Sequence, residues 1–271
     1  IRDRHPFGNK NFFKGEFLVY KLKIIGVNMK YLLALVGVVA MPSFAADLST
    51  NDMTGITFWL VTAAMLAATV FFFAERDVVK GKWKTSLSVA GLVTGVAFWH
   101  YLYMRGVWAD TGTSPTVYRY IDWLITVPLQ IIEFYLILRV CTNVGSGLFW
   151  KLLVASLVML IAGFLGEIGS APAWPAFIVG MIAWLYIIYE VFSGEAGQLN
   201  ASSGNAAAQS AFSTIRLIVT FGWAIYPIGY ILGVGSNPDM ANANIIYNLA
   251  DFINKIAFGL AIYVAAVSDS D

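Results

Sequence analysis

Three ionisable residues interrupt a strongly apolar stretch near the middle of the chain. Arg119, Asp122 and Glu133 stand among Ile, Leu, Val and Phe side chains between residues 119 and 135. If this stretch crosses a membrane, their burial costs roughly 7–10 kcal/mol, at about 2.5–3.5 kcal/mol for each charged residue. Ionisable residues in membrane spans usually mark ion pathways or ligand sites. The stretch is therefore a candidate for transport or signalling chemistry.

Helical spacing would place these groups on one side of a helix. Arg119 and Asp122 are three residues apart, so we expect them to pair on one face. Asp122 and Glu133 are eleven residues apart, so both carboxyls should face the same way, about 16 Å apart along the axis. Thr126, one turn after Asp122, adds a hydroxyl to that face. The pattern predicts protonatable groups spaced along the membrane normal.

A second pair of charges lies near the C-terminus. Asp251 and Lys255 are four residues apart and share a helix face. Burial disfavours a charged ammonium, so Lys255 could present a neutral amine that condenses with an aldehyde to form an imine. A protonated imine would need a nearby carboxylate, for which Asp122 and Asp251 are candidates. Alternatively, both charge pairs could merely tie helices together, although Glu133 has no basic partner within helical reach.

Aromatic residues could line a cavity for a flat ligand. Those that stand out are Trp123, Trp184, Trp223, Tyr226 and Tyr230, together with Pro227. A proline within a helix frees a carbonyl and bends the helix, which can open room for a ligand. Ordinary bundle packing or interfacial anchoring would explain the same aromatic pattern.

The elements that position these residues are long apolar helices. Hydrophobic residues make up 59% of the 271 residues and charged residues 12%, about half the usual share in soluble domains. We predict an all-α membrane protein, a bundle of seven transmembrane helices. The expected spans are 55–74, 85–104, 116–138, 149–167, 172–193, 211–234 and 243–267. The longest link, 194–209, is rich in Ser, Ala, Asn and Gly and is expected to be mobile.

Basic residues in the links predict the orientation. The first and third links hold most of them, namely Arg76, Lys80, Lys82, Lys84, Arg139 and Lys151. The positive-inside rule therefore places the N-terminus of the bundle outside and its C-terminus in the cytoplasm. Asp122 would then lie toward the outer half of its helix and Glu133 toward the cytoplasmic half.

The N-terminal region is interpreted separately from the bundle. Residues 29–46 are typical of a secretory signal, with Lys30, an apolar core over 31–41 and small residues after it. The alternative is an extra membrane helix, but the apolar run is shorter than the ~20 residues of a span. We interpret residues 1–28 as an upstream or added leader without function, and 47–271 as the transmembrane domain. The single cysteine and two distant histidines predict no metal site.

Several motifs resemble those of the microbial rhodopsins, and most closely the proteorhodopsins. The resemblance covers residues 29–267. It rests on RYIDWLITVPL (119–129), Glu133, WAIYP (223–227) and DFINK (251–255), with FWHYLYMRG (98–106) also matching. It implies that all-trans retinal is bound covalently to Lys255 as a protonated Schiff base, in a multi-pass protein of the bacterial cytoplasmic membrane.

The resemblance also assigns roles to the charged residues. Asp122 would be the primary counterion and proton acceptor, Asp251 the second counterion, and Arg119 part of an outer charge complex. Glu133 would be the cytoplasmic proton donor. Asp122, Thr126 and Glu133 form the set typical of outward proton pumps in this family.

Further residues would hold or tune the chromophore. The family places Trp123, Trp184, Trp223, Tyr226 and Pro227 against the polyene, and Tyr230 continues the same helix face. His100 would adjust the proton affinity of Asp122, since histidine titrates in a useful range. In the proteorhodopsins, a glutamine at the position of Gln130 is associated with blue absorption, and a leucine there with green absorption. A hydrogen-bonded core residue is the alternative for both His100 and Gln130.

The implied function is a light-driven outward proton pump, a transporter and not an enzyme. The physical reasoning agrees: Asp122 should be ionised beside the imine cation, and Glu133 should be neutral in its apolar surroundings. The alternatives are a sensory photoreceptor of the same fold, a pump for another ion, and a receptor or carrier without a chromophore. The resemblance also implies a homo-oligomer of five or six subunits in contact with membrane lipid. No nucleic-acid partner is expected.

Overall fold

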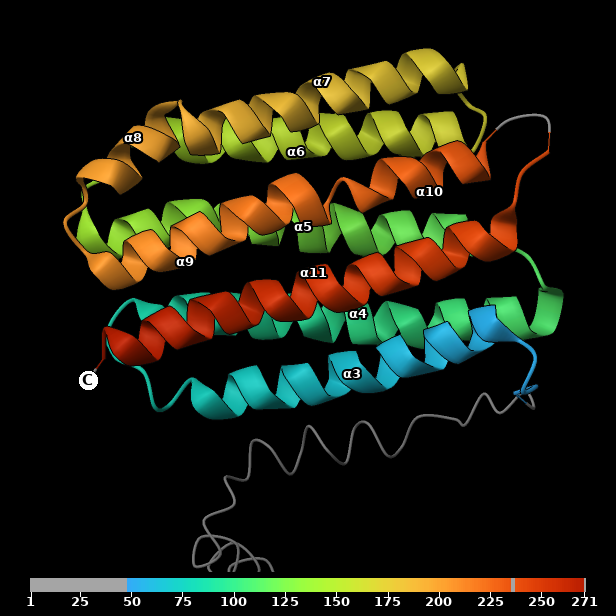
Figure 1. Cartoon of the computed structure of the whole chain (residues 1–271), viewed down its shortest axis with the longest axis horizontal. Coiled ribbons are helices and arrows are strands. Elements are labelled where there is room, and N and C mark those ends of the chain that lie inside the picture. The colour runs from blue at the N-terminus through green and yellow to red at the C-terminus, as the bar shows by residue number, and fades with distance from the viewer. Residues whose placement is uncertain (1–47, 235–236, 271) are drawn as a thin grey trace, which may run out of the picture. The chain divides into compact units, whose positions relative to one another are not determined.

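Long helices that run along one direction make up the part of the chain described in the computed structural model, residues 48–234 and 237–270 (Figure 1). Within this range seven helical segments are long and apolar enough to cross a membrane, and no strand occurs. The elements are α3 (Met53–Glu75), α4 (Trp83–Thr111), α5 (Thr116–Cys141), α6 (Ser146–Glu167), α7 (Ala173–Phe192), α8 (Glu195–Ser202), α9 (Ala206–Leu217), the π-helix η1 (Ile218–Gly222), α10 (Ile225–Gly233) and α11 (Met240–Ser268). The predicted signal sequence, 29–46, lies outside the described residues.

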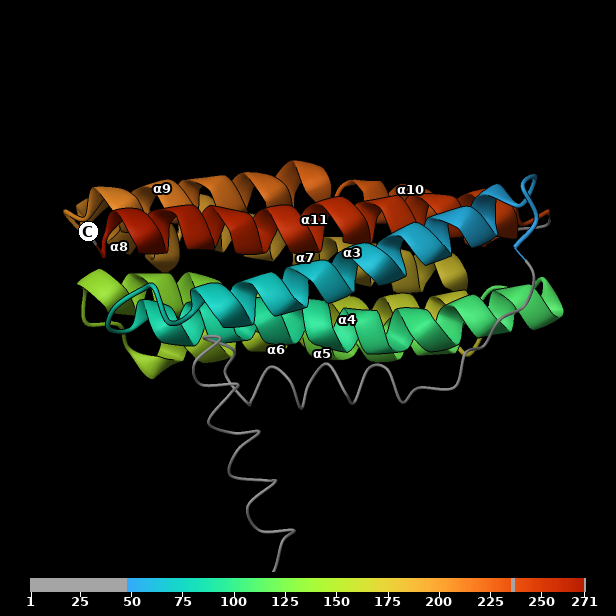
Figure 2. The same cartoon turned by 90° about the horizontal axis from the view of Figure 1, so that it is seen from below.

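The seven predicted spans are confirmed, with longer helices than expected. Helices α7 and α8 together form the fifth span, Ala173–Ser202, and α9, η1 and α10 form the sixth, Ala206–Gly233. Helices that follow each other in the chain pack side by side, and α11 closes the bundle by packing against α3, α4, α9 and α10. Seen from below, α9, α10 and α11 lie on one side of the bundle and α4, α5 and α6 on the other (Figure 2).

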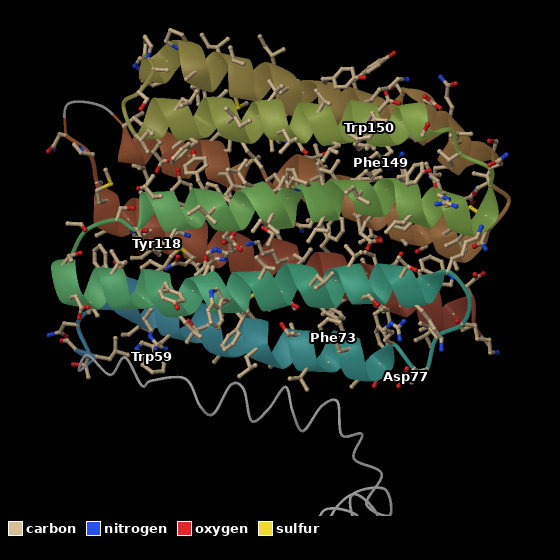
Figure 3. All side chains as sticks on the ribbon, turned by 180° about the vertical axis from the view of Figure 1, so that it is seen from behind. Trp59, Phe73, Asp77, Tyr118, Phe149 and Trp150 are labelled. Carbon is tan, nitrogen blue, oxygen red and sulfur yellow. The ribbon has the colours of Figure 1, made fainter. Side chains whose placement is uncertain are left out.

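Apolar side chains cover the outside of the bundle, and the charged and polar residues of its spans are buried within a mainly hydrophobic interior. On α5 the buried face holds charged or polar residues, including Arg119, Asp122 and Glu133, whereas Ile121 and Ile125 are exposed. Large side chains such as Trp59, Tyr118 and Trp150 point outward from the helices (Figure 3). Water would penalise this surface, but lipid does not, so the polarity pattern supports a membrane location.

The link 194–209 is ordered by helices, so the prediction that it is mobile is wrong. Helix α8 covers residues 195–202, and α9 begins at Ala206 after an Asn205 cap that accepts a hydrogen bond from the Ala208 amide (2.8 Å). Glu190, buried near the end of α7, accepts a hydrogen bond from the Ala196 amide (3.2 Å). Composition alone suggested flexibility, but small side chains also allow close packing, and Ala196 and Ala208 are buried.

The sixth span is interrupted one turn before its proline, where a proline is expected to free a carbonyl and disturb the helix. Its helix widens into η1 and then turns at Trp223 and Ala224, one turn ahead of Pro227. Pro227 lies in the first turn of α10, where a missing N–H costs no helical hydrogen bond. The Asn254 side-chain amide of α11 donates to the Gly222 carbonyl (3.0 Å), which satisfies an acceptor freed by the π-helix.

Side-chain caps fix both ends of the bundle. Asp52 accepts a hydrogen bond from the Gly55 amide (2.8 Å) at the start of α3. Asp239 accepts from the Asn242 amide and side chain at the start of α11, and these bonds lower the pKa of Asp239 below its ordinary value. At the opposite end, Asp269 accepts from Trp83 (2.7 Å) and from Asn205 (2.9 Å), and so connects the ends of α4, α9 and α11.

Candidate functional site

A buried lysine lies between two carboxylates in the middle of the bundle. Lys255 of α11 is 2% exposed, and Asp122 and Asp251 are both fully buried. The Lys255 Nζ contacts Asp122 Oδ2 on α5, and it lies 3.4 Å from Asp251 Oδ2 one turn earlier on α11. The structure therefore brings together the amine and the two carboxylates that sequence reasoning had selected as its partners.

The two carboxylates differ in how completely they are hydrogen-bonded. Asp251 accepts from Tyr101 (2.9 Å), Tyr226 (2.8 Å) and the Trp123 indole (3.1 Å) as well as from the lysine. Asp122 accepts at Oδ2 from Lys255, and its Oδ1 has no hydrogen-bond partner among the described residues. Asp251 is therefore held by several donors, whereas one oxygen of Asp122 has no partner among the described residues.

Two predicted neighbours of Asp122 lie close to it without binding its carboxyl. His100 Nδ1 is 3.8 Å from Asp122 Oδ1, and its hydrogen bond goes to the Val96 carbonyl (3.0 Å). The Thr126 hydroxyl donates to the backbone carbonyl of Asp122 (3.0 Å). Both residues can influence Asp122 only through space or through intervening groups.

The predicted pairing of Arg119 with Asp122 is wrong. The Arg119 guanidinium donates to Asn244 Oδ1 (2.8 Å), to Asn248 Oδ1 (2.9 Å) and to the Tyr101 hydroxyl (3.3 Å). Side chains of a helix lean toward its N-terminus, so Arg119 extends away from Asp122, which lies one turn later. The i,i+3 spacing predicted that both residues lie on one face of the helix. It could not show that the Asp122 carboxyl contacts Lys255 on another helix.

Glu133 is buried in the opposite half of α5, with the buried Ser86 side chain of α4 beside it. It is 1% exposed, and neither carboxyl oxygen has a hydrogen-bond partner among the described residues. A charged carboxylate without a partner is very costly in such a place, so this group is expected to be neutral there. The structure thus separates two kinds of carboxyl along one helix face, one beside a cation and one in apolar surroundings.

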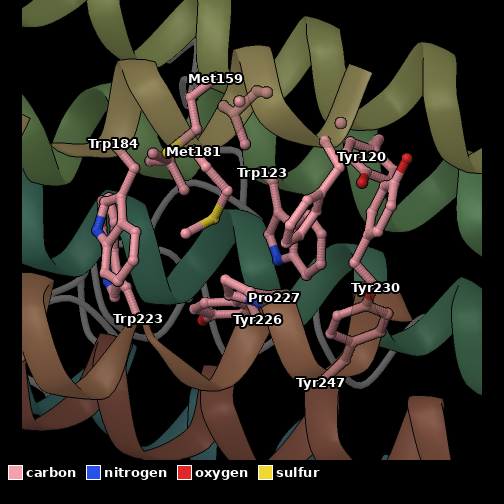
Figure 4. Close-up of a pocket in the computed structure, with 15 residues that line it drawn as sticks. Tyr120, Trp123, Met159, Met181, Trp184, Trp223, Tyr226, Pro227, Tyr230 and Tyr247 are labelled. Atoms are coloured by element: carbon pink, nitrogen blue, oxygen red, sulfur yellow. The ribbon is translucent and has the colours of Figure 1, made fainter. Parts of the chain in front are cut away.

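An aromatic cavity adjoins the charged centre (Figure 4). It is lined by Tyr120, Trp123, Val127, Met159, Leu160, Gly163, Phe177, Gly180, Met181, Trp184, Trp223, Tyr226, Pro227, Tyr230 and Tyr247. All six aromatic and proline positions singled out from the sequence belong to this set. Trp123 and Tyr226 line the cavity and also donate to Asp251, so they connect it to the charges. The Trp223 indole N–H is buried without a partner among the described residues.

Gln130 is buried on α5 but is absent from this lining. Its side-chain nitrogen has no hydrogen-bond partner among the described residues. Trp184, at the end of the cavity shared with Trp223, is fixed by donation to the Val219 carbonyl (2.9 Å).

Sequence reasoning missed several polar residues of the centre. Asn244 and Asn248 hold Arg119, and with Asp251 and Lys255 they form a stripe at spacings of four, three and four residues on α11. That helical stripe was a usable signal. Glu167, which accepts from Tyr120 (2.8 Å) and Tyr247 (3.3 Å), stands at the end of a span and gave no comparable signal.

Known proteins share this architecture and sequence. The family model described as "Bacteriorhodopsin-like protein" matches residues 52–268. A green-light absorbing proteorhodopsin of Gamma-proteobacterium EBAC31A08 is 61% identical over 247 residues, 89% of this chain and 99% of the relative. A blue-light absorbing proteorhodopsin of Gamma-proteobacterium Hot 75m4 is 60% identical, over 89% of this chain and 98% of the relative.

Solved structures agree with these sequence relatives. The crystal structure of a blue light-absorbing proteorhodopsin from Med12 has 63% sequence identity and a TM-score of 0.71, covering 80% of this chain and all of that chain. The Exiguobacterium sibiricum rhodopsin structure has 34% identity and a TM-score of 0.72, with 80% of this chain covered and 97% of that one. The chain therefore belongs to the bacteriorhodopsin-like family of membrane proteins, in which it is similar to the proteorhodopsins.

Proposed function

We propose that this protein is a light-driven outward proton pump that carries all-trans retinal on Lys255. The observation that carries the proposal is the position of Lys255, buried and in contact with both Asp122 and Asp251. Lysine burial between carboxylates suits a permanent cation at Nζ, such as the imine that an aldehyde forms with an amine. The similarity to proteorhodopsins supports the same conclusion.

The residues around this lysine fit retinal. The adjoining cavity is apolar and mostly aromatic, as a polyene requires, and Trp123 and Tyr226 link it to the carboxylates. When bound, retinal would supply a cation at Lys255 that absorbs visible light and changes geometry on absorption. Trp123, Trp184, Trp223, Tyr226, Pro227 and Tyr230 are the residues that would hold it.

The carboxyl groups of α5 would give the proton its direction. Asp122 would accept a proton from Lys255 Nζ at Oδ2, the oxygen that the lysine contacts, while its Oδ1 lies 3.8 Å from His100 Nδ1. Asp251 would remain ionised, because its oxygens already accept from two tyrosines and an indole. Glu133, neutral in its apolar surroundings, would return a proton to the lysine and refill from the other side of the membrane.

The direction of transport follows from the proposed orientation. The basic links support an orientation with the start of α3 outside and the end of α11 in the cytoplasm, in which Glu133 would face the cytoplasm. We further propose residence in the bacterial cytoplasmic membrane, removal of residues 29–46 as a signal sequence, and 47–271 as the transmembrane domain. The family resemblance supports a homo-oligomer of five or six subunits surrounded by lipid.

Illumination of cells that make the protein tests this function. Cells supplied with all-trans retinal should show a visible absorption band, and light should acidify the medium until an uncoupler is added. Lys255→Ala should lack the band, and Asp122→Asn should keep a band but should not acidify. Absence of any band in the unaltered protein would overturn the proposal. A band without uncoupler-sensitive acidification would instead support a sensory photoreceptor.

A further inference from the structure

The buried cation on α5 is held by amide groups. Arg119 is 1% exposed, and its Nη2 donates to Asn244 Oδ1 (2.8 Å) and Asn248 Oδ1 (2.9 Å). Within the described residues, no carboxylate oxygen lies within 4.0 Å of this guanidinium. A buried guanidinium normally pairs with a carboxylate, because such charge-assisted bonds are the strong ones. The amides bind Arg119 without cancelling its charge.

Both amides are fixed in the orientation that accepts from Arg119. The Asn248 nitrogen donates to Thr57 Oγ1 of α3 (2.9 Å), and the Asn244 nitrogen donates to the Met240 carbonyl (2.8 Å). Both asparagines are fully buried, so these bonds are shielded from bulk solvent. Because each nitrogen has its own acceptor, each oxygen must face the guanidinium.

One side chain connects this arrangement to the carboxylates. The Tyr101 hydroxyl accepts from Arg119 Nη1 (3.3 Å) and donates to Asp251 Oδ2 (2.9 Å). Asp251 in turn shares Lys255 with Asp122. If the asparagine oxygens were removed, the strongest acceptors left for Arg119 would lie in this direction, through Tyr101 toward the two carboxylates.

We propose that Asn244 and Asn248 are positioning residues that hold Arg119 away from Asp122 and thereby set how readily Asp122 takes up a proton. This inference rests on the proposed function, in which Asp122 is the acceptor. A cation kept at a distance stabilises the Asp122 carboxylate less than a cation beside it. The asparagines therefore keep Asp122 basic enough to receive the proton from Lys255.

A colour titration of the retinal-bound protein tests the inference. Protonation of a carboxylate beside a cationic chromophore changes the absorption maximum, so the titration midpoint reports on Asp122. The double variant Asn244→Leu/Asn248→Leu should lower this midpoint by about one pH unit, a tenfold change in proton affinity. The carboxyl C=O infrared band should move with it, and this band can also be followed before retinal is added.

Three further variants make the test specific. Asn242→Leu, on the same helix but exposed and bonded to Asp239, should leave the midpoint unchanged. In an Arg119→Gln background, the double leucine variant should produce no further shift, because the asparagines act through Arg119. Asn248→Ser removes the side-chain carbonyl that accepts from Arg119 and keeps a hydroxyl that can donate to Thr57. This variant replaces the leucine variants in the titration if they do not fold.

The outcomes separate this inference from the proposed function. A parent protein without a pigment or without pumping would refute the function itself. A parent that pumps normally while the asparagine variants show an unchanged or raised midpoint would refute only the positioning role. An equal shift with Arg119→Gln already present would also refute it, because the asparagines would then act on Asp122 directly.

Discussion

The two aspartates beside Lys255 are chemically alike, and their hydrogen bonds give them different capacities. Asp251 is engaged by Tyr101, Tyr226 and Trp123, whereas Asp122 Oδ1 has no partner among the described residues. Donors stabilise a carboxylate in its ionised form, so the better-bonded group is the poorer proton acceptor. This difference supports the proposal that Asp122 is the proton acceptor and Asp251 a counterion.

Glu133 provides a kinetic prediction at the residue scale. Glu133→Gln removes the buried carboxyl of that half of α5 while it keeps nearly the same shape. We expect the pigment to form normally and to return to its resting state more slowly, by roughly 10²-fold, because a proton donor contributes about that much. Flash spectroscopy measures this recovery. Glu195→Gln, at a partly exposed position in an ion pair with Lys151, is the control. An unchanged rate for Glu133→Gln would show that Glu133 is not the donor.

Gln130 provides a spectral prediction at the same scale. Its side chain is buried on α5, two turns after Asp122, and its amide carries a dipole that would act on a chromophore attached to Lys255. Fixed dipoles that favour the ground state widen the excitation gap, and the proteorhodopsin resemblance associates this glutamine with blue absorption. Gln130→Leu should therefore move the absorption maximum to longer wavelength when all-trans retinal is added. A maximum that stays in place or moves to shorter wavelength would contradict this assignment.

At the scale of elements, close contact between α10 and α11 shapes the cavity. A Cβ atom on Gly229 would collide with the ring of Tyr247, which lines the cavity and donates to Glu167. The break at η1 leaves α10 as a short separate rod against α11, so small residues are needed where the two touch.

Gly229→Ala is therefore expected to destabilise the protein by about 1–3 kcal/mol, the usual cost of overpacking. Gly233→Ala is the matched control, because it lies on the same helix and its Cβ would be 3.5 Å from the nearest atom, on Glu167, an ordinary contact. Thermal loss of the visible band measures both variants. Equal stability of the two alanine variants would show that the α10–α11 contact relaxes around the extra methyl group.

At the scale of the whole molecule, the orientation decides whether the pump moves protons outward. Cys141 is the single cysteine of the chain, so Cys141→Ser gives a background in which one new cysteine can be labelled. We expect Thr113→Cys, in the exposed turn between α4 and α5, to react with an impermeant maleimide in intact spheroplasts. Ser202→Cys, exposed at the end of α8, should react only after lysis. The reverse pattern would invert the proposed direction of transport.

The sequence by itself determined the class of the molecule. The lengths of the apolar segments predicted seven membrane helices, because the thickness of the bilayer sets how many residues a span needs. Helical spacing identified Asp122, Glu133, Asp251 and Lys255, because a charge in a span is costly enough to be conspicuous. The sequence also indicated the aromatic face formed by Trp223, Tyr226 and Tyr230, because these residues recur at the period of a helix.

Only the tertiary structure decided which of these groups meet. The partner of Arg119 could not be read from α5, because a long side chain chooses among acceptors on other helices, and Asn244 and Asn248 of α11 outcompete Asp122. Asn254 of α11 satisfies a carbonyl at the break before Pro227, and Glu190 and small buried alanines support the helices of residues 194–209. Each of these outcomes is a contact between segments distant in the chain, and spacing within one helix carries no information about such contacts.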